Sequence, residues 1–157
     1  MKKLSALSAL FALALLQPAP VSGQQPAPPA YKPELIEFMV FTQIRHAKLW
    51  LAGNAGNWEL AEYEIDELNE VLQNAAKHVP DYKGIPVGKM IESLAAAPIE
   101  EVEKTIKAKD RVRFAAAYDK LTAACNTCHQ SANRPFIVIQ RPSGSAFPNQ
   151  SFTPRRN

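Results

Sequence analysis

Five residues near the end of the chain, Cys125-Asn126-Thr127-Cys128-His129, have the types and spacing to do chemistry. They include the only two cysteines among 157 residues, and a histidine directly follows the second. In an exported protein this pattern is typical of a c-type haem attachment site. Residues three apart lie on nearly one face of a helix, so both thiols reach the vinyl groups of one haem. The adjacent imidazole then supplies a ring nitrogen to the iron.

Cysteine pairs with this spacing also occur in disulfides, redox sites and zinc sites. A redox-active pair usually accompanies a βαβ pattern, which this sequence lacks. A zinc site needs more ligands, and no second CxxC or HxxxH completes a tetrahedron around Cys128 and His129. The sequence therefore predicts one covalent haem c, with thioether bonds from Cys125 and Cys128 and with His129 as the proximal iron ligand.

The first 23 residues have the organisation of a secretory signal peptide. A start with two lysines is followed by an apolar run over 4–16 and by small residues up to Gly23. The run is too short to span a membrane comfortably. We predict cleavage after Gly23, less favourably after Ala19, with an uncleaved anchor as the alternative. A periplasmic protein with no membrane span after signal removal is expected.

Charge is distributed unevenly along the chain. Residues 33–103 contain thirteen acidic and five basic residues, whereas residues 104–157 contain two acidic and ten basic residues. One interpretation is attraction between two faces inside the fold. The other is a basic surface that steers an acidic redox partner protein. The basic residues are scattered without interleaved aromatic residues, so nucleic-acid binding is not expected.

Apolar residues at helical spacing predict four helices. Asn57 and Asp110 are expected to cap the second and fourth helices. Pro98 predicts a kink or break in the third. Acidic residues 59–70 are expected on solvent-exposed faces of the second. The expected helices cover residues 33–52 with a stop at Gly53, residues 58–78, residues 87–108, and the stretch from Asp110 to before Pro135.

Helices of about 20 residues with short connections predict an all-α, antiparallel up-down four-helix bundle. The expected order is a signal peptide over 1–23, a proline-rich leader over 24–32, the haem-binding bundle over 33–131 and a tail over 132–157. The tail has a β-branched run without a partner strand, so we expect an extended segment packed on the bundle, with Phe147 and Phe152 as candidate anchors.

The two cysteines continue an inward-facing stripe of the fourth helix. Phe114, Tyr118, Leu121, Cys125 and Cys128 follow one another in steps of four and three. In an up-down bundle, the end of this helix lies beside the start of the first, the end of the second and the start of the third. The expected neighbours of the haem are therefore residues 35–39, 72–79 and 87–91.

This plan resembles the class II cytochromes c, which include cytochrome c′ and the low-spin cytochromes c-556. The resemblance covers roughly residues 33–131 and rests on helix order, motif position, Cys125, Cys128 and His129. Pro98 and the tail depart from the compact family members. The resemblance implies periplasmic electron transfer through haem, or alternatively a five-coordinate haem that binds NO or CO. Class II relatives often pair through the first two helices, so a homodimer is a further expectation.

The sixth iron ligand has several candidates. Met39 lies about 8 Å along the first helix from its start, and the low-spin relatives place a methionine on this helix. His46 lies two turns further on, and Met90 starts the third helix. A vacant site suits gas binding, with an apolar wall expected from Leu35, Phe38 and Phe41.

An enzyme, such as a peroxidase, is not expected. It needs an acid–base group over the iron, and His46 is the only candidate, without an Arg or Asp partner. Lys83, Arg134 and Arg141 are candidates for neutralising the haem propionates.

Overall fold

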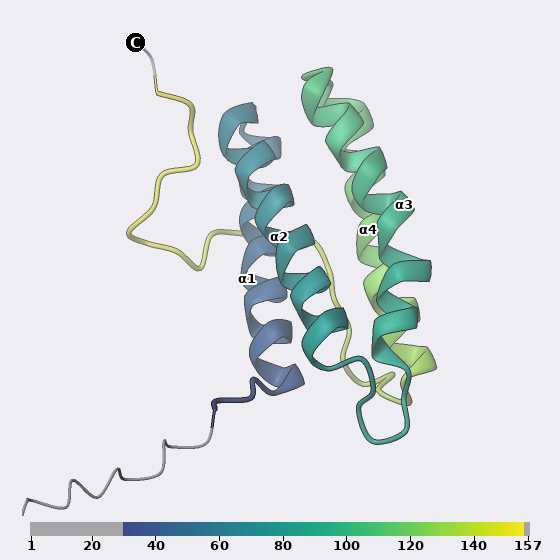
Figure 1. The fold of residues 1–157 in the computed structure, drawn as a ribbon. Coiled ribbons are helices and arrows are strands. Elements are labelled where there is room, and N and C mark those ends of the chain that lie inside the picture. The colour runs from purple at the N-terminus through teal and green to yellow at the C-terminus, as the bar shows by residue number, and fades with distance from the viewer. Residues whose placement is uncertain (1–29, 156–157) are drawn as a thin grey trace, which may run out of the picture. The chain divides into compact units, whose positions relative to one another are not determined.

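A computed structural model describes residues 30–155, and these residues contain four helices (Figure 1). The predicted signal peptide and most of the leader, residues 1–29, lie outside the described residues. Residues 30–155 contain no strand, and one isolated bridge joins Tyr82 and Ile85. The all-α antiparallel bundle is therefore confirmed. The helices are α1 (Leu35–Asn54), α2 (Trp58–His78), α3 (Val87–Lys107) and α4 (Arg111–Ser131).

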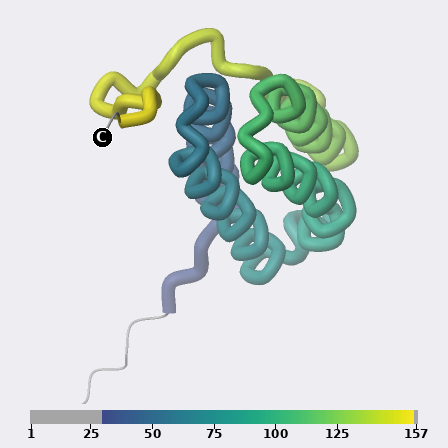
Figure 2. Tube along the Cα trace, turned by 90° about the horizontal axis from the view of Figure 1, so that it is seen from above, coloured from purple at the N-terminus to yellow at the C-terminus, as the bar shows by residue number. Residues whose placement is uncertain are grey.

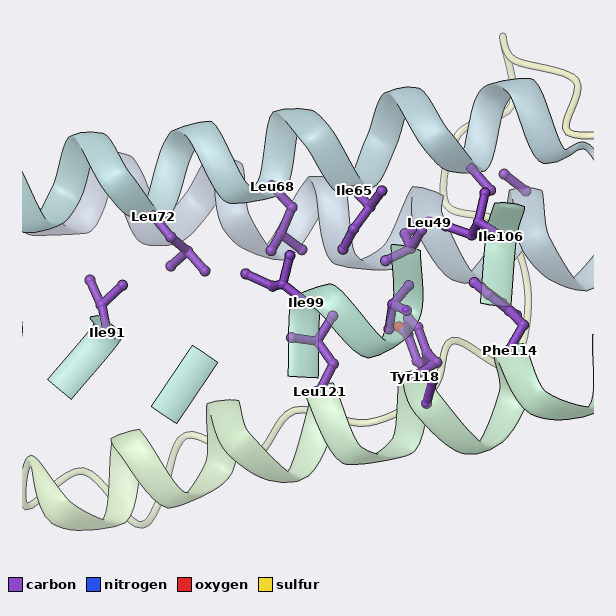
Figure 3. Packing of buried hydrophobic residues seen from close by; sticks show 14 of the residues in the cluster. Leu49, Ile65, Leu68, Leu72, Ile91, Ile99, Ile106, Phe114, Tyr118 and Leu121 are labelled. Atoms are coloured by element: carbon purple, nitrogen blue, oxygen red, sulfur yellow. The ribbon is translucent and has the colours of Figure 1, made fainter. Parts of the chain in front are cut away.

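The helices pack in chain order around one core. Helices α1 and α2, α2 and α3, and α3 and α4 form extensive pairs, whereas α4 and α1 touch least (Figure 2). The core is fully buried at Ile65 and Leu68 of α2 and at Tyr118 and Leu121 of α4 (Figure 3). Burial of these side chains supplies the main driving force for the bundle.

Both predicted caps are present. The Asn57 side chain accepts a hydrogen bond from the Leu60 amide at 3.3 Å. The Asp110 carboxylate accepts from the amides of Val112 and Arg113, both at 3.0 Å. Each cap satisfies amide groups that the first turn of a helix leaves without a helical acceptor.

The predicted end of the first helix at Ala52 is two residues too early, because α1 continues through Gly53 to Asn54. Gly53 is buried inside the helix, and a Cβ atom there would lie 2.2 Å from the Phe114 ring. The glycine thus serves close packing between α1 and α4. The turn itself uses Gly56, which has a positive φ of 74°.

Two further expectations need correction. Of the expected kink or break at Pro98, the break is absent, because helix α3 is continuous through this residue. A proline removes one helical hydrogen bond, and burial of Ile99 and Val102 in the turn that follows Pro98 holds this part of the helix in the core. Glu64 of α2 is buried rather than solvated, because the Arg45 guanidinium of α1 pairs with it at 3.2 Å.

The tail after α4 has no helix in its described part, residues 132–155. Two of its aromatic residues, Phe147 and Phe152, are among its contacts with the bundle. Phe152 packs against the core, and its ring centroid lies 6.1 Å from that of Phe147. The Lys48 ammonium of α1 lies 5.0 Å from the Phe147 ring centroid.

The close contact between Gly53 and the Phe114 ring predicts that one added methyl group lowers stability. Gly53→Ala should lower the free energy of unfolding by about 1–3 kcal/mol, because overpacking exceeds the gain in helix propensity. Chemical denaturation measures this loss. Gly144→Ala, in open space, should leave stability unchanged. Adding Phe114→Leu to Gly53→Ala should relieve the clash, and additive losses in the double variant would contradict the explanation.

Candidate functional site

Cys125, Cys128 and His129 line one cavity at the end of the bundle where α4 terminates. The cavity has a volume of about 320 Å³, at the lower limit for sites that hold small molecules and cofactors, roughly 300–1,000 Å³. Both cysteines are free thiols. The sequence-predicted neighbours are brought together, since the other walls include Leu35 and Met39 of α1, Leu72 of α2, and Val87, Met90 and Ile91 of α3.

The lining of this cavity is predominantly apolar. Ile36 and Val40 of α1 lie along it, together with Tyr82 and Ile85 of the α2–α3 connection. Leu35 is the only member of the expected apolar wall that lines it. The Phe38 ring instead stacks on His78 at 6.5 Å between centroids, and Phe41 is 55% exposed.

His46, the second candidate for the sixth ligand, has both ring nitrogens engaged. Its Nδ1 lies 2.8 Å from the Tyr118 hydroxyl and its Nε2 lies 3.0 Å from the Thr122 hydroxyl. The ring is only 3% exposed, and burial lowers its pKa to about 4. His46 is thus a neutral imidazole whose hydrogen bonds join α1 to α4.

Met39 and Met90 remain available to the cavity. Each is half-buried and lines it, Met39 from α1 and Met90 from α3. These two helices flank α4 on opposite sides. A thioether from either therefore faces the same space as His129.

Burial keeps the two thiols protonated. It raises the pKa of Cys125 to about 11, with a smaller contribution from Cys128, and also raises the pKa of Cys128. Redox-active CxxC pairs have the opposite property, a lowered thiol pKa next to positive charge or a helix N-terminus. This environment, near a helix C-terminus, does not generate a reactive thiolate.

The imidazole of His129 has a defined tautomer. Its Nδ1 lies 3.2 Å from the carbonyl oxygen of Ile137, in the tail. A carbonyl only accepts, so Nδ1 carries the proton and Nε2 keeps its lone pair. Histidines that bind metals through one ring nitrogen usually donate the N–H of the other nitrogen in this way, to a carbonyl, a carboxylate or water.

The three basic candidates differ in position. Arg134 lines the cavity. Arg141 forms hydrogen bonds to Asp119 and lies 4.3 Å from the Trp50 ring centroid. The Lys83 ammonium lies over the Tyr82 ring at 5.1 Å. Arg134 is therefore the one placed to meet an anionic group in the cavity.

Sequence reasoning found the residues of the attachment motif and missed their partners. Tyr118 is a core residue, as the apolar stripe predicts, and its hydroxyl contacts His46, which is 72 positions away in the sequence. The contacts of Asn126 and His129 with the tail left no periodic signal. Only the tertiary structure pairs them.

Within residues 30–155, no three His, Cys, Asp or Glu side chains gather into a metal-binding cluster, and no helix is long and apolar enough to cross a membrane. No family model, curated protein or solved structure matches the chain. The class that fold and site define is an up-down four-helix bundle with two cysteines near the end of its C-terminal helix.

Buried His46 predicts a pH dependence of stability. The unfolded chain binds a proton at position 46 below pH 6.5, whereas the folded chain does so only near pH 4. The free energy of unfolding should therefore fall as pH drops through this window, by up to about 3 kcal/mol from this group. Denaturant titrations of the wild type and His46→Gln measure it.

The control for this experiment is His78→Gln, since His78 is exposed. It should retain the wild-type pH dependence. An equal dependence in His46→Gln and the wild type would contradict burial of a neutral His46.

Proposed function

We propose that this protein is a periplasmic c-type cytochrome that transfers electrons through one covalent haem c. Cys125 and Cys128 form its thioether bonds and His129 is its proximal ligand. The observation that carries this proposal is the convergence of both thiols and the imidazole on one apolar cavity. When bound, the haem supplies one-electron redox chemistry at its iron.

The residues around the cavity fit such a group. An apolar lining from α1, α3 and the α2–α3 connection suits the faces of a porphyrin. Arg134 supplies a positive charge for the propionates. The His129 Nε2 lone pair is free to bind a metal, because Nδ1–H is committed to Ile137. The raised pKa of Cys125 argues against a disulfide-exchange role for this pair.

Met39 is our proposed sixth ligand. His46 is a poorer choice, since coordination would break its bond to Thr122 and leave a buried hydroxyl without that partner. Met90 is the alternative methionine. Methionine opposite histidine raises the reduction potential relative to two histidines.

Export and partnership follow from the same proposal. Signal cleavage after Gly23 delivers the chain to the periplasm, where an unidentified redox partner protein exchanges electrons with it. A homodimer remains a proposal from the resemblance. We propose no enzymatic activity, since His46 is not free to act as an acid or base over the iron.

A second candidate function is capture of NO or CO by a five-coordinate haem. The apolar side chains of Leu35, Ile36 and Val40 favour it, because they line the α1 side of the cavity without offering a ligand. Visible spectra in both oxidation states separate the two functions. A low-spin spectrum supports electron transfer, and a high-spin spectrum that shifts with CO supports gas binding.

Replacing both thiols tests attachment. Cys125→Ser with Cys128→Ser should abolish covalent haem, because no thioether can form. The mass of mature, periplasmically expressed protein and acid–acetone extraction measure it. Haem that resists extraction in the double variant would contradict the proposal, as would a wild-type mass without added porphyrin.

Replacing the methionines tests the sixth ligand. Met39→Leu should convert a low-spin spectrum to a high-spin one, because leucine fills the space without donating a sulfur lone pair. Met90→Leu is the matched control and should stay low-spin. Conversion by Met90→Leu alone would transfer the role to Met90, and conversion by neither would exclude both methionines.

A further inference from the structure

The chain reverses direction directly after α4 and runs back along it. Asn133 adopts a left-handed conformation with φ of 55° at the reversal. Three contacts show the direction of the tail, because residues later in the tail contact residues earlier in α4. These contacts are Ile137 with His129, Ile139 with Asn126, and Arg141 with Asp119. Residues 134–141, which we name the strap, therefore lie antiparallel to the last turns of α4.

Asn126 holds the middle of the strap with two hydrogen bonds. Its Nδ2 donates to the Ile139 carbonyl at 2.9 Å, and its Oδ1 accepts from the Ile139 amide at 2.8 Å. A carboxamide presents a donor and an acceptor side by side, as a neighbouring strand does. The change Asn126→Asp would remove the Nδ2 donor, and the change Asn126→Ala would remove both the donor and the Oδ1 acceptor.

Arg141 anchors the far end of the strap. Its guanidinium forms two hydrogen bonds of 2.6 Å to the Asp119 carboxylate and one of 3.0 Å to the Ala115 carbonyl. It also lies over the Trp50 ring of α1. The two parallel hydrogen bonds between guanidinium and carboxylate fix both the position and the orientation of the Arg141 side chain.

The strap covers one side of the candidate haem cavity. Ile137 and Ile139 line the cavity, while Phe136 and Val138 are 76% and 70% exposed. Phe136 belongs to a turn that the Ile137 amide closes by donating to the Arg134 carbonyl at 3.0 Å. From Ile137 to Arg141 the strap has no turn, and its residues alternate as in an extended segment with one face toward the cavity. The inward face brings the Ile137 carbonyl to His129 Nδ1.

We propose that the strap orients the His129 imidazole, and that Asn126, inside the attachment motif, is the positioning residue that holds the strap. The inference rests on the proposed function, because its consequence is exerted on an iron ligand. Sharing the Nδ1 proton with a carbonyl makes the imidazole a stronger donor at Nε2. A stronger donor stabilises ferric over ferrous iron and lowers the reduction potential.

The test compares two substitutions within the motif. Asn126→Ala should accelerate exchange of the Ile139 amide proton at least tenfold, because the Oδ1 acceptor is lost. It should also raise the reduction potential by up to about 59 mV, which for one electron is a tenfold change in ferric over ferrous stabilisation. Thr127→Ala is the matched control, since the Thr127 hydroxyl bonds only the Ala123 carbonyl of its own helix. It should change neither quantity.

Arg141→Gln provides a second variant outside the motif, in case Asn126→Ala impairs folding or haem attachment. It should raise the potential in the same direction. Faster exchange of Ile139 with an unchanged potential would overturn the positioning role. Unchanged exchange in Asn126→Ala would overturn the holding role.

Failure of the proposed function is recognised separately, by a wild-type mass without porphyrin. The ¹⁵N shifts of the His129 ring then test the strap itself. The wild type should show a single tautomer protonated at Nδ1, and Asn126→Ala should show mixed tautomers. Mixed tautomers in the wild type would overturn the proposal.

Discussion

The hydrogen bonds that join His46 to Tyr118 and Thr122 fix the separation of α1 and α4. Among neighbouring helices of the bundle, these two have the least extensive contact. Every group in the network has a partner, and the Thr122 hydroxyl also donates to the Tyr118 carbonyl at 2.9 Å. Polar groups buried this deeply are costly without such partners. The network therefore allows little sliding of α1 along α4. Because both helices line the cavity, their fixed alignment also fixes the positions of the cavity walls.

Side-chain size explains why the bundle is filled at one end and hollow at the other. At the filled end, Phe114 lies 6.2 Å from Trp50 and 6.0 Å from Trp58 between ring centroids. Trp50 and Tyr118 lie 5.0 Å apart. Where α4 ends, aliphatic and methionine side chains replace these rings and leave about 320 Å³ unfilled. A space of this size is within the range of sites that hold small molecules.

Each position of the attachment motif has a different environment although all five share one helix. Cys125, Cys128 and His129 line the cavity. Asn126 binds the strap, and Thr127 is exposed. Helical periodicity separates these directions by about 100° per residue. A single short sequence can thus line a cavity with three of its side chains and anchor the tail with a fourth.

The sequence by itself determined the four helices, two of their caps and the inward direction of the cysteines, because these depend on local spacing and on near-neighbour hydrogen bonds. It also indicated which helix ends meet, since short connections force antiparallel neighbours. Tertiary structure alone decided that Gly53 is a packing contact for Phe114, that Glu64 is buried with Arg45, and that both nitrogens of His46 are occupied. It also decided that Asn126 and His129 contact the strap. Each of these features joins residues distant in sequence or on opposite sides of a turn. No periodicity encodes such contacts, and only the packed chain brings them together.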